Sequence, residues 1–238
     1  MKPVIRLLSV AITIAVLLFS SSCFECIEGD GNVIQKTIEV GEFTKIKLNG
    51  DANITLTSDS TALFLIKGEK NIIDEYSVEV EGQTLKIGTK HCLRNHEQVS
   101  LQIPYKKLES VILNGSGSVF ANEPVKTSSL NLRINGSGDF ELPAEVKDLS
   151  GVINGSGDIV ITGTAANADF SINGSGNIDT PGLTVEQCSV TVNGSGDCSV
   201  WVTGNLKVNI RGSGNVYYKG EPAIYTDIKG SGSVNKKE

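Results

Sequence analysis

A short polar loop holds both histidines of the chain and is the first place to look for chemistry. His91, Cys92 and His96 lie close together in the sequence. Zinc accepts imidazole nitrogen and thiolate sulfur, so these residues are a candidate metal site. A closed zinc site needs a fourth ligand, and no second histidine or cysteine pair supports one. The simpler interpretation is a surface loop with a disulfide cysteine, and we expect no metal and no other cofactor.

Aspartates at a repeated position form a second candidate site. Asp139, Asp158 and Asp197 each directly follow a Gly-Ser-Gly phrase. Calcium-binding β-rolls also place aspartates between stacked turns, but their repeat is nine residues long. In this chain the same position alternates with residues such as Ser118 and Asn177. We therefore expect a solvated polar ladder, with a cation between Asp139 and Asp158 as the weaker alternative.

The basic residues argue against an enzyme that cleaves acidic polysaccharides. Such an enzyme needs an acidic cluster and a basic residue on one face. The arginines after the start of the chain are Arg94, Arg133 and Arg211, and the last two occupy different offsets in distant repeats. We predict no catalytic residue and no enzymatic activity. A polysaccharide-acting enzyme is the third functional alternative, because a fold by itself does not fix a function.

Outward-facing aromatic residues are the candidate ligand contacts. Trp201 and Tyr217 fall in neighbouring repeats and are expected on the same strand face. Their rings offer an apolar face to a sugar ring and a polar edge for hydrogen bonds. The alternative is that they pack beneath the C-terminal segment together with Tyr225, because single surface aromatics need no functional explanation.

These residues are positioned by a repeat in the C-terminal half of the chain. When the copies of the repeat are aligned, each has an apolar residue two positions before its Gly-Ser-Gly phrase and another after the corner. The aligned copies therefore show two apolar columns. Residues between the columns are small or polar, which is the period-two alternation of half-buried strands. Glycine allows positive φ at a corner, and asparagine tolerates a left-handed turn. The copies begin at Gly115, Gly136, Gly155, Gly174, Gly194, Gly212 and Gly230.

A repeat of this length predicts a solenoid. Stacked rungs about 4.8 Å apart would give a rod roughly 30 Å long. The alternative is an antiparallel meander, because Asn-Gly between apolar residues is also a hairpin signal. A meander needs a second turn in each repeat, and the segments available for it differ in length and composition. The phrase Asn49–Ile54 matches the repeat imperfectly and predicts the first rung.

Composition and charge narrow the functional classes. The chain has 238 residues, 26 glycines and few aromatics, which suits one solenoid with a narrow aliphatic core. Its 21 basic and 27 acidic residues argue against nucleic-acid binding, which needs a basic surface.

The N-terminus has the pattern of an export signal. Lys2 and Arg6 precede an apolar run that ends at Phe19, so residues 1–22 are predicted to be a signal peptide. The small residues before Cys23 resemble a bacterial lipobox, although such boxes usually carry Leu where Ser20 stands. We predict lipid attachment at Cys23 and a tether over residues 23–32.

Four further cysteines follow the predicted lipid site. Cys188 and Cys198 are in the inward phase of their strands and are expected to be buried thiols. Cys26 and Cys92 are the better pair for a disulfide, which would fasten the tether to the folded domain in an oxidising compartment. Four thiols allow three pairings, so other pairings stay open.

The remaining chain is predicted to form a single β-solenoid domain over residues 33–238. Residues 109–235 are its Gly-Ser-Gly rungs, and residues 55–108 are an irregular insert of strands around a tight hairpin turn. A structure of this kind at one end would cover the open rung and its unpaired backbone groups. The strands expected in the insert are 62–67, 76–81, 84–88 and 99–104, with one helical turn at 71–74.

The order of these segments resembles a known bacterial family. A lipoprotein signal, opening strands, the hairpin at 76–88 and then Gly-Ser-Gly-Ser/Asp rungs are similar to the putative auto-transporter adhesin, head GIN domain family of Bacteroidetes-type bacteria. The resemblance covers about residues 33–235. It implies an all-β fold, a right-handed parallel β-helix-like solenoid with an N-terminal β-hairpin cap, and an envelope location.

The leading functional hypothesis is a non-enzymatic, lipid-anchored envelope protein that acts as an adhesin or as a glycan- or protein-binding rod. Its expected partners are the membrane, through the N-terminal lipid, and a glycan or envelope protein. The expected location is the outer membrane, on its periplasmic or outer side. The alternative is a structural or regulatory periplasmic component without an external ligand.

Overall fold

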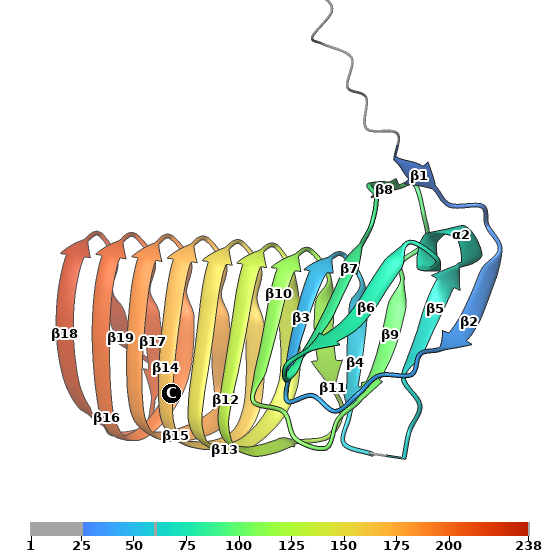
Figure 1. Ribbon diagram of the computed structural model, residues 1–238. Coiled ribbons are helices and arrows are strands. Elements are labelled where there is room, and N and C mark those ends of the chain that lie inside the picture. The colour runs from blue at the N-terminus through green and yellow to red at the C-terminus, as the bar shows by residue number, and fades with distance from the viewer. Residues whose placement is uncertain (1–25, 60, 238) are drawn as a thin grey trace, which may run out of the picture.

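The computed structural model describes residues 26–59 and 61–237, which are almost entirely strand. The predicted signal peptide and Cys23 lie outside the described residues. The chain forms a β-solenoid of about 7 turns with a broader N-terminal end (Figure 1). Among the described residues, no helix is long and apolar enough to span a membrane.

Each rung of the solenoid has two layers. The front layer in Figure 1 runs up to a glycine-rich corner, and the back layer returns to a bend at the lower edge. We call these two edges the corner edge and the bend edge. Most later rungs are continuous strands of 15 to 17 residues that pass around the bend. The rung strands are β3 (Lys45–Gly50), β4 (Asn53–Thr57), β10 (Ser110–Gly115), β11 (Ser118–Ala121), β12 (Val125–Gly136), β13 (Asp139–Gly155), β14 (Ile159–Gly174), β15 (Ile178–Gly194), β16 (Cys198–Gly212), β17 (Val216–Lys219), β18 (Ala223–Gly230) and β19 (Val234–Lys236).

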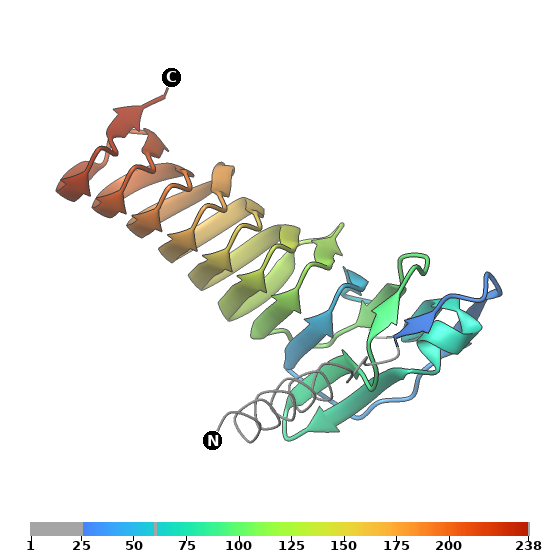
Figure 2. The same ribbon diagram turned by 90° about the horizontal axis from the view of Figure 1, so that it is seen from above.

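The rungs stack in parallel and in register. Leu113 pairs with Leu48 on one side and with Ile134 on the other, so equivalent positions of the repeat are neighbours. Gly115 likewise pairs with Gly50, which confirms the imperfect first copy of the repeat. The parallel pairing rules out the antiparallel meander. Figure 2 shows the rungs following one another along a slightly twisted rod.

The core is a pair of aliphatic columns between the layers. Leu113, Ile134 and Ile153 are fully buried in the front column, while Val119 lines the back one. Gly151 breaks the apolar pattern because the ring of Phe170, in the next rung, fills its place. A Cβ at Gly151 would lie 2.9 Å from Cδ1 of Phe170. The volume missing from one rung is thus supplied by its neighbour, as dense interior packing requires.

Unequal repeat lengths are absorbed in the back layer. The pairing of β15 with β16 shifts register between Thr180 and Thr184, around Pro181 and Gly182. The front layer and the corner remain aligned, because Gly194 still pairs with Gly212. An insertion therefore changes the back of a rung and leaves the corner row straight.

The N-terminal end extends both layers, and we call residues 26–44 and 58–108 the cap. In the front layer β7 pairs with β3 in parallel and β6 pairs with β7 in antiparallel. In the back layer β9 pairs with β4, and β5 and β2 follow in antiparallel. The strand expected at 62–67 actually forms a few residues later. The cap elements are β1 (Ile27–Glu28), β2 (Val33–Thr37), β5 (Leu65–Glu69), α2 (Lys70–Ile73), β6 (Tyr76–Glu81), β7 (Thr84–Thr89), β8 (Leu93–Arg94) and β9 (Ser100–Pro104).

Candidate functional site

The corner edge is a straight row of Gly-Ser-Gly turns. The amide of Ser156 donates to the carbonyl of Gly136 in the preceding rung, at 2.9 Å. Gly155 has φ +146°, and a Cβ on it would lie 2.0 Å from the oxygen of Gly136. A Cβ on Gly157 would lie 1.8 Å from the oxygen of Gly138. Both glycines are therefore required by close backbone stacking, whereas the serine between them is exposed.

Asparagines before the corners form a hydrogen-bonded ladder. The amide nitrogen of Asn154 donates to the side-chain oxygen of Asn135 at 2.8 Å, and Asn173 donates to Asn154 at 2.9 Å. The pattern runs from Asn49 to Asn193, after which Arg211 takes the position. Each asparagine inside the ladder donates to one neighbour and accepts from the other, so this ladder stabilises the stack.

The aspartates after the corners have a similar structural role. Asp139 accepts the backbone N–H of Asp158 at 3.0 Å, and Asp158 accepts that of Asn177 at 2.8 Å. An asparagine can take the same role, because the side-chain oxygen of Asn177 accepts the backbone N–H of Asp197 at 3.0 Å. This explains why Asp and Asn alternate at the position. Among the described residues, no group of three or more His, Cys, Asp or Glu is arranged to hold a metal ion.

The candidate zinc ligands in the loop with both histidines do not converge on one point. Cys92 is bonded to Cys26 in a disulfide, so its sulfur is not available to zinc. His91 Nδ1 lies 2.7 Å from the carboxylate of Glu75. His96 is mostly buried, and its Nδ1 contacts the carbonyl of Glu97. The Cys92 sulfur is thus used by the disulfide, and the two imidazoles make different contacts.

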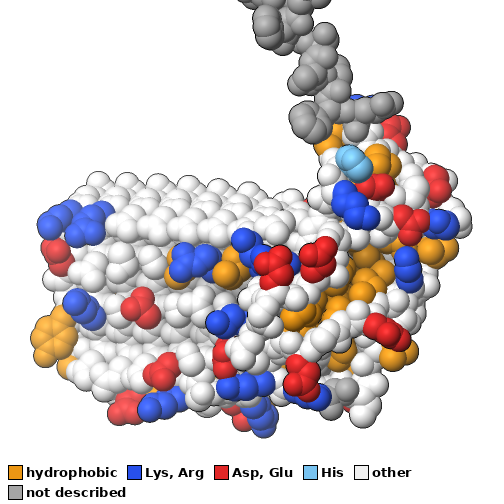
Figure 3. Space-filling view, viewed as in Figure 1, with side chains coloured by type: hydrophobic (Ala, Val, Ile, Leu, Met, Phe, Trp, Pro, Cys, Tyr) orange, Lys and Arg blue, Asp and Glu red, His pale blue; other side chains and the backbone are white. Residues whose placement is uncertain are grey.

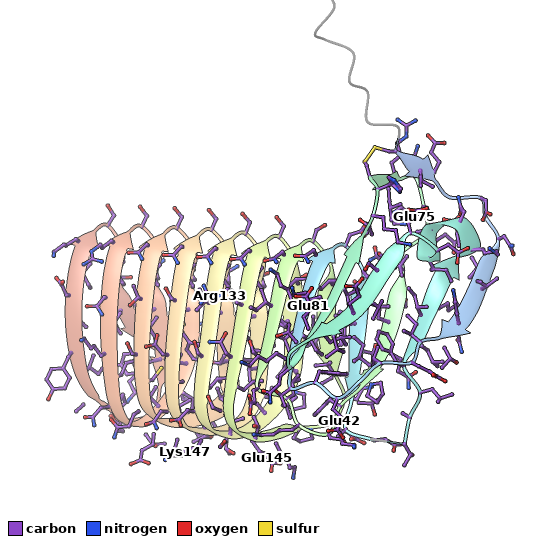
Figure 4. The ribbon with its side chains drawn as sticks, in the orientation of Figure 1. Glu42, Glu75, Glu81, Arg133, Glu145 and Lys147 are labelled. Atoms are coloured by element: carbon purple, nitrogen blue, oxygen red, sulfur yellow. A yellow bond between two sulfur atoms is a disulfide. The ribbon has the colours of Figure 1, made fainter. Side chains whose placement is uncertain are left out.

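The disulfide stands above the corner edge, where β1 pairs with β8 (Figure 4). Beneath it, buried Glu69 holds the connection from β1 to β2. Its carboxylate accepts the N–H of Gly31 at 2.6 Å and that of Glu97 at 2.9 Å. Gly29 leaves room for this carboxylate, because a Cβ there would lie 2.0 Å from Oε2 of Glu69. The entry of the chain is therefore fixed by the disulfide and by hydrogen bonds that include those to Glu69.

The predicted aromatic pair lies on the outer face of the back layer. Trp201 pairs in register with Lys219, and Tyr217 with Ser199, so the rings are diagonal neighbours. The ammonium of Lys219 lies 4.6 Å from the centre of the Trp201 ring, and that of Lys237 lies 4.3 Å from the centre of the Tyr217 ring. One face of each ring is thus covered by a cation from the chain itself.

Tyr225 does not join that pair. It is on β18 in the front layer, in register with Lys207, and its side chain is 67% exposed. No lysine or arginine lies over its ring among the described residues. Trp201 and Tyr217 therefore do not pack with Tyr225, because the two groups lie on opposite layers. Lys237 of the C-terminal segment does cover Tyr217.

The concave regions of the described surface include one in the cap, one on the front layer and one on the back layer. A cavity of about 370 Å³ in the cap is lined by Val40, Phe43 and Tyr105 among others. A groove of about 480 Å³ follows the front layer near the bend edge from β12 to β18. A third, of about 400 Å³, lies on the back layer and includes Tyr217 and Lys237. These volumes suit small ligands or short stretches of polymer.

The two thiols in the rungs are buried and free of disulfide bonds. Burial raises the pKa of Cys188 to about 12, with a smaller contribution from Asp169. Burial also raises the pKa of Cys198 well above its usual value. Both groups are therefore neutral thiols near pH 7 and are poor nucleophiles.

A comparison with protein-family models shows the family to which the chain is similar. The model described as "Putative auto-transporter adhesin, head GIN domain" matches residues 42–222, which is most of the chain. The chain belongs to this family. The description of the head GIN domain family indicates an envelope or surface protein and favours a role other than catalysis. No match was found among curated proteins.

Solved structures share the fold over nearly the whole chain. A "putative adhesin" from Bacteroides fragilis is 26% identical, with a TM-score of 0.82, and the match covers 89% of this chain and 100% of that one. A "putative lipid binding protein" from Parabacteroides distasonis is 29% identical, with a TM-score of 0.79 and coverage of 90% and 100%. A second protein from that species, a "putative adhesin", is 28% identical, with a TM-score of 0.70 and the same coverage.

Several features of the surface were not found from the sequence. The buried Glu69 has no sequence signal, because its partners are backbone amides from two distant segments. The cap cavity forms where separate strands meet, so it has no sequence signal either. The groove had a signal that could have been used. The inward column beside the bend holds Leu149 and Leu206, but Ala168 and Cys188 in between are smaller.

Proposed function

We propose that this protein is a non-enzymatic adhesin of the cell envelope, anchored by a lipid on Cys23, which presents a rigid solenoid to a glycan or protein partner. The observation that carries the proposal is the disulfide between Cys26 and Cys92. Only Phe24 and Glu25 stand between Cys23 and this bond. A lipid at Cys23 would therefore hold the cap directly at the membrane.

The rungs support this role through their rigidity. Backbone ladders, side-chain ladders and a continuous core make the rod a stack in which each rung is fixed by its neighbours. Such a body can hold many weak contacts in a fixed spacing without losing much conformational entropy on binding. The predicted contacts include Trp201 and Tyr217, which, together with their lysines, present both aromatic and cationic groups.

The test is protease accessibility of the protein on intact cells. Digestion of the rungs on whole cells, and release of the protein from the membrane by Cys23→Ala, are the expected results. Cys188→Ala is a matched control, because it removes a cysteine outside the export signal. Protection until the outer membrane is opened would contradict the adhesin and favour a structural or regulatory component of the periplasm.

A second candidate function is lipid binding in the cap cavity. Val40, Phe43 and Tyr105 give this cavity an apolar lining, and Lys106 and Lys107 stand at its edge. Lys106 pairs with Glu42, which projects at the lower edge of the cap (Figure 4). An amphipathic molecule fits this combination of apolar wall and charged rim. The protein from P. distasonis that is 29% identical carries the description of a lipid-binding protein.

Displacement of a fluorescent fatty acid tests this second candidate. Phe43→Arg, which places a charge in the apolar wall, is expected to abolish binding because the ligand would have to desolvate it. Val33→Arg, at an exposed position outside the cavity, is the control. Equal binding by both variants would contradict a lipid site at this cavity.

A further inference from the structure

The front-layer groove lies between two outward columns of polar side chains. The column nearer the bend contains Asp148, Asn167 and Gln187 in consecutive rungs, each in register with the next. The other contains Ser150, Asp169, Ser189 and Lys207 in consecutive rungs. Because rungs recur about every 4.8 Å, a polar side chain repeats in each column along the rod at that spacing. The groove therefore runs along the rod axis, across the strands.

The floor of the groove over β14 and β15 is formed by small side chains. Ala168 and Cys188 stand there in the column that holds Leu149 before them and Leu206 after them. Ala168 and Cys188 are each 5% exposed, so they are part of the core and also line the groove. The hollow is thus built by small residues at matched positions in adjacent rungs.

The hydrogen-bonding groups that remain in the groove are mixed. Asn167 donates to Asp148 at 2.7 Å and Asn205 donates to Gln187 at 2.9 Å. These bonds leave the Oδ1 of Asn167 and the Nε2 of Gln187 without a partner among the described residues. The serine hydroxyls of the second column can both donate and accept. A ligand with many hydroxyl groups, each a donor and an acceptor, matches this lining.

The charges of the groove argue against a strongly ionic ligand. Asp148 and Asp169 are acidic and Lys207 is basic, so the lining carries a net charge of about −1 at neutral pH. Figure 3 shows that the front face over β12–β16 is mostly backbone and side chains that are neither charged nor hydrophobic, with isolated charges. A polyanion would be repelled by the carboxylates, and a polycation would have only two carboxylates with which to pair.

Tyr225 closes the β18 end of the groove. Its ring is 67% exposed and, unlike Trp201 and Tyr217, has no cation over it among the described residues. The ring has an apolar face that can stack on the apolar face of a sugar. Of Trp201, Tyr217 and Tyr225, Tyr225 is therefore the one best prepared for such a contact.

We propose that this groove binds an extended, neutral glycan chain that lies along the rod axis and stacks one sugar on Tyr225. The proposal rests on the proposed function and specifies the site and the ligand class. It places binding on the front layer, away from Trp201 and Tyr217. A chain that spans several rungs gains polar contacts at each one, so affinity should rise with chain length.

Calorimetry or biolayer interferometry on the full chain in detergent tests the proposal. The probes are length series of cello-, manno- and isomalto-oligosaccharides, with oligogalacturonides as the acidic counterpart and a Gly/Ser-rich peptide as the peptide counterpart. We expect binding to at least one neutral series that strengthens with length. No binding to any neutral series, or tighter binding to the acidic series or the peptide, would overturn the proposal.

Variants locate the site. Tyr225→Ala should weaken binding about tenfold, which is the loss of one stacking contact of roughly 1.4 kcal/mol, while Tyr225→Phe keeps the ring and the affinity. Ser189→Tyr should block the groove. Ser171→Tyr makes the same change on the same layer outside the groove and should leave binding intact. Binding that survives Ser189→Tyr but is lost in Trp201→Ala would overturn the groove and leave the adhesin function standing.

Discussion

The cap and the rungs are made of the same kind of strand but are stabilised in opposite ways. In the rungs one set of contacts recurs, such as the bond from Ser156 to Gly136 and its equivalents in the other corners. In the cap the decisive contacts occur once, such as the disulfide and the two backbone donors to Glu69. Most ion pairs also belong to the cap, including Lys106 with Glu42.

The difference shows why a further rung is easily added to the stack, whereas the end of the stack needs a structure of its own. A rung needs only the correct phase and two glycines, because its neighbour supplies the rest of the environment. The end of the stack needs new pairings, since a bare rung would expose unpaired edge groups. The cap provides them with the parallel strands β7 and β9, and antiparallel strands, held by specific bonds, follow outside these.

The largest expected effect is at the corner glycines. Gly155→Ala adds both a strained φ and a clash with the preceding rung, and should lower the free energy of unfolding by roughly 3–5 kcal/mol. Gly157→Ala adds the clash alone. Gly50→Ala, which has φ +141° but open space around its Cβ, adds the strain alone. Chemical denaturation of each variant measures these losses.

The control for this set is Gly41→Ala in the cap, where φ is ordinary and no atom lies within 4 Å of the new Cβ. It should change stability by no more than about 0.5 kcal/mol. Ser156→Ala, between the two glycines, should be equally mild. If Gly155→Ala were as mild as Gly41→Ala, the rungs would not depend on their corners and the contrast with the cap would fail.

The next effect is that of the disulfide. Cys26→Ser with Cys92→Ser should destabilise the folded chain by about 2–4 kcal/mol, because the bond restrains a long loop in the unfolded state. The loss should be local to the cap. Hydrogen exchange is expected to speed up in β1, β2 and β8 while the rungs keep their protection. Uniform loss of protection in both regions would show that cap and rungs unfold as one unit.

A smaller effect is expected at Glu69. Glu69→Ala leaves the N–H groups of Gly31 and Glu97 without their acceptor and should cost about 1–3 kcal/mol. Glu69→Gln keeps one acceptor oxygen and should cost less. Glu39→Gln, at an exposed position, is the control. Thermal melts measure the three, and equal melting temperatures for Glu69→Ala and Glu39→Gln would contradict the role given to this carboxylate.

The smallest effect concerns the rung thiols and appears only at high pH. The folded pKa of Cys188 is about 12, against 9.0 for an ordinary thiol, so the folded state binds more protons between these values. Stability should therefore be unaffected below about pH 9 and fall as the pH rises towards 12. Native protein with Cys23→Ala should not react with a thiol reagent at pH 8, and unfolding should expose both thiols. Rapid reaction of the native protein would show that the rungs open more readily than the core indicates.

The sequence by itself determined the rungs. Period-two alternation places Leu113 and Val119 inward in any such strand, and the glycines of each corner specify where the chain turns. These are local properties of the sequence, and they are easy to recognise because they recur in every copy of the repeat. The parallel solenoid, the family and the first imperfect rung at Asn49–Ile54 could all be predicted for this reason.

Only the tertiary structure decided how the cap and the surface are organised. The order of β6, β7 and β9 around the first rung, the carboxylate of Glu69 under the entry of the chain, and the groove beside Ala168 each depend on residues distant in sequence. Their chemistry is set by which segments meet. A strand encodes its own two faces, but its neighbours and the hollows between them are properties of the assembled stack.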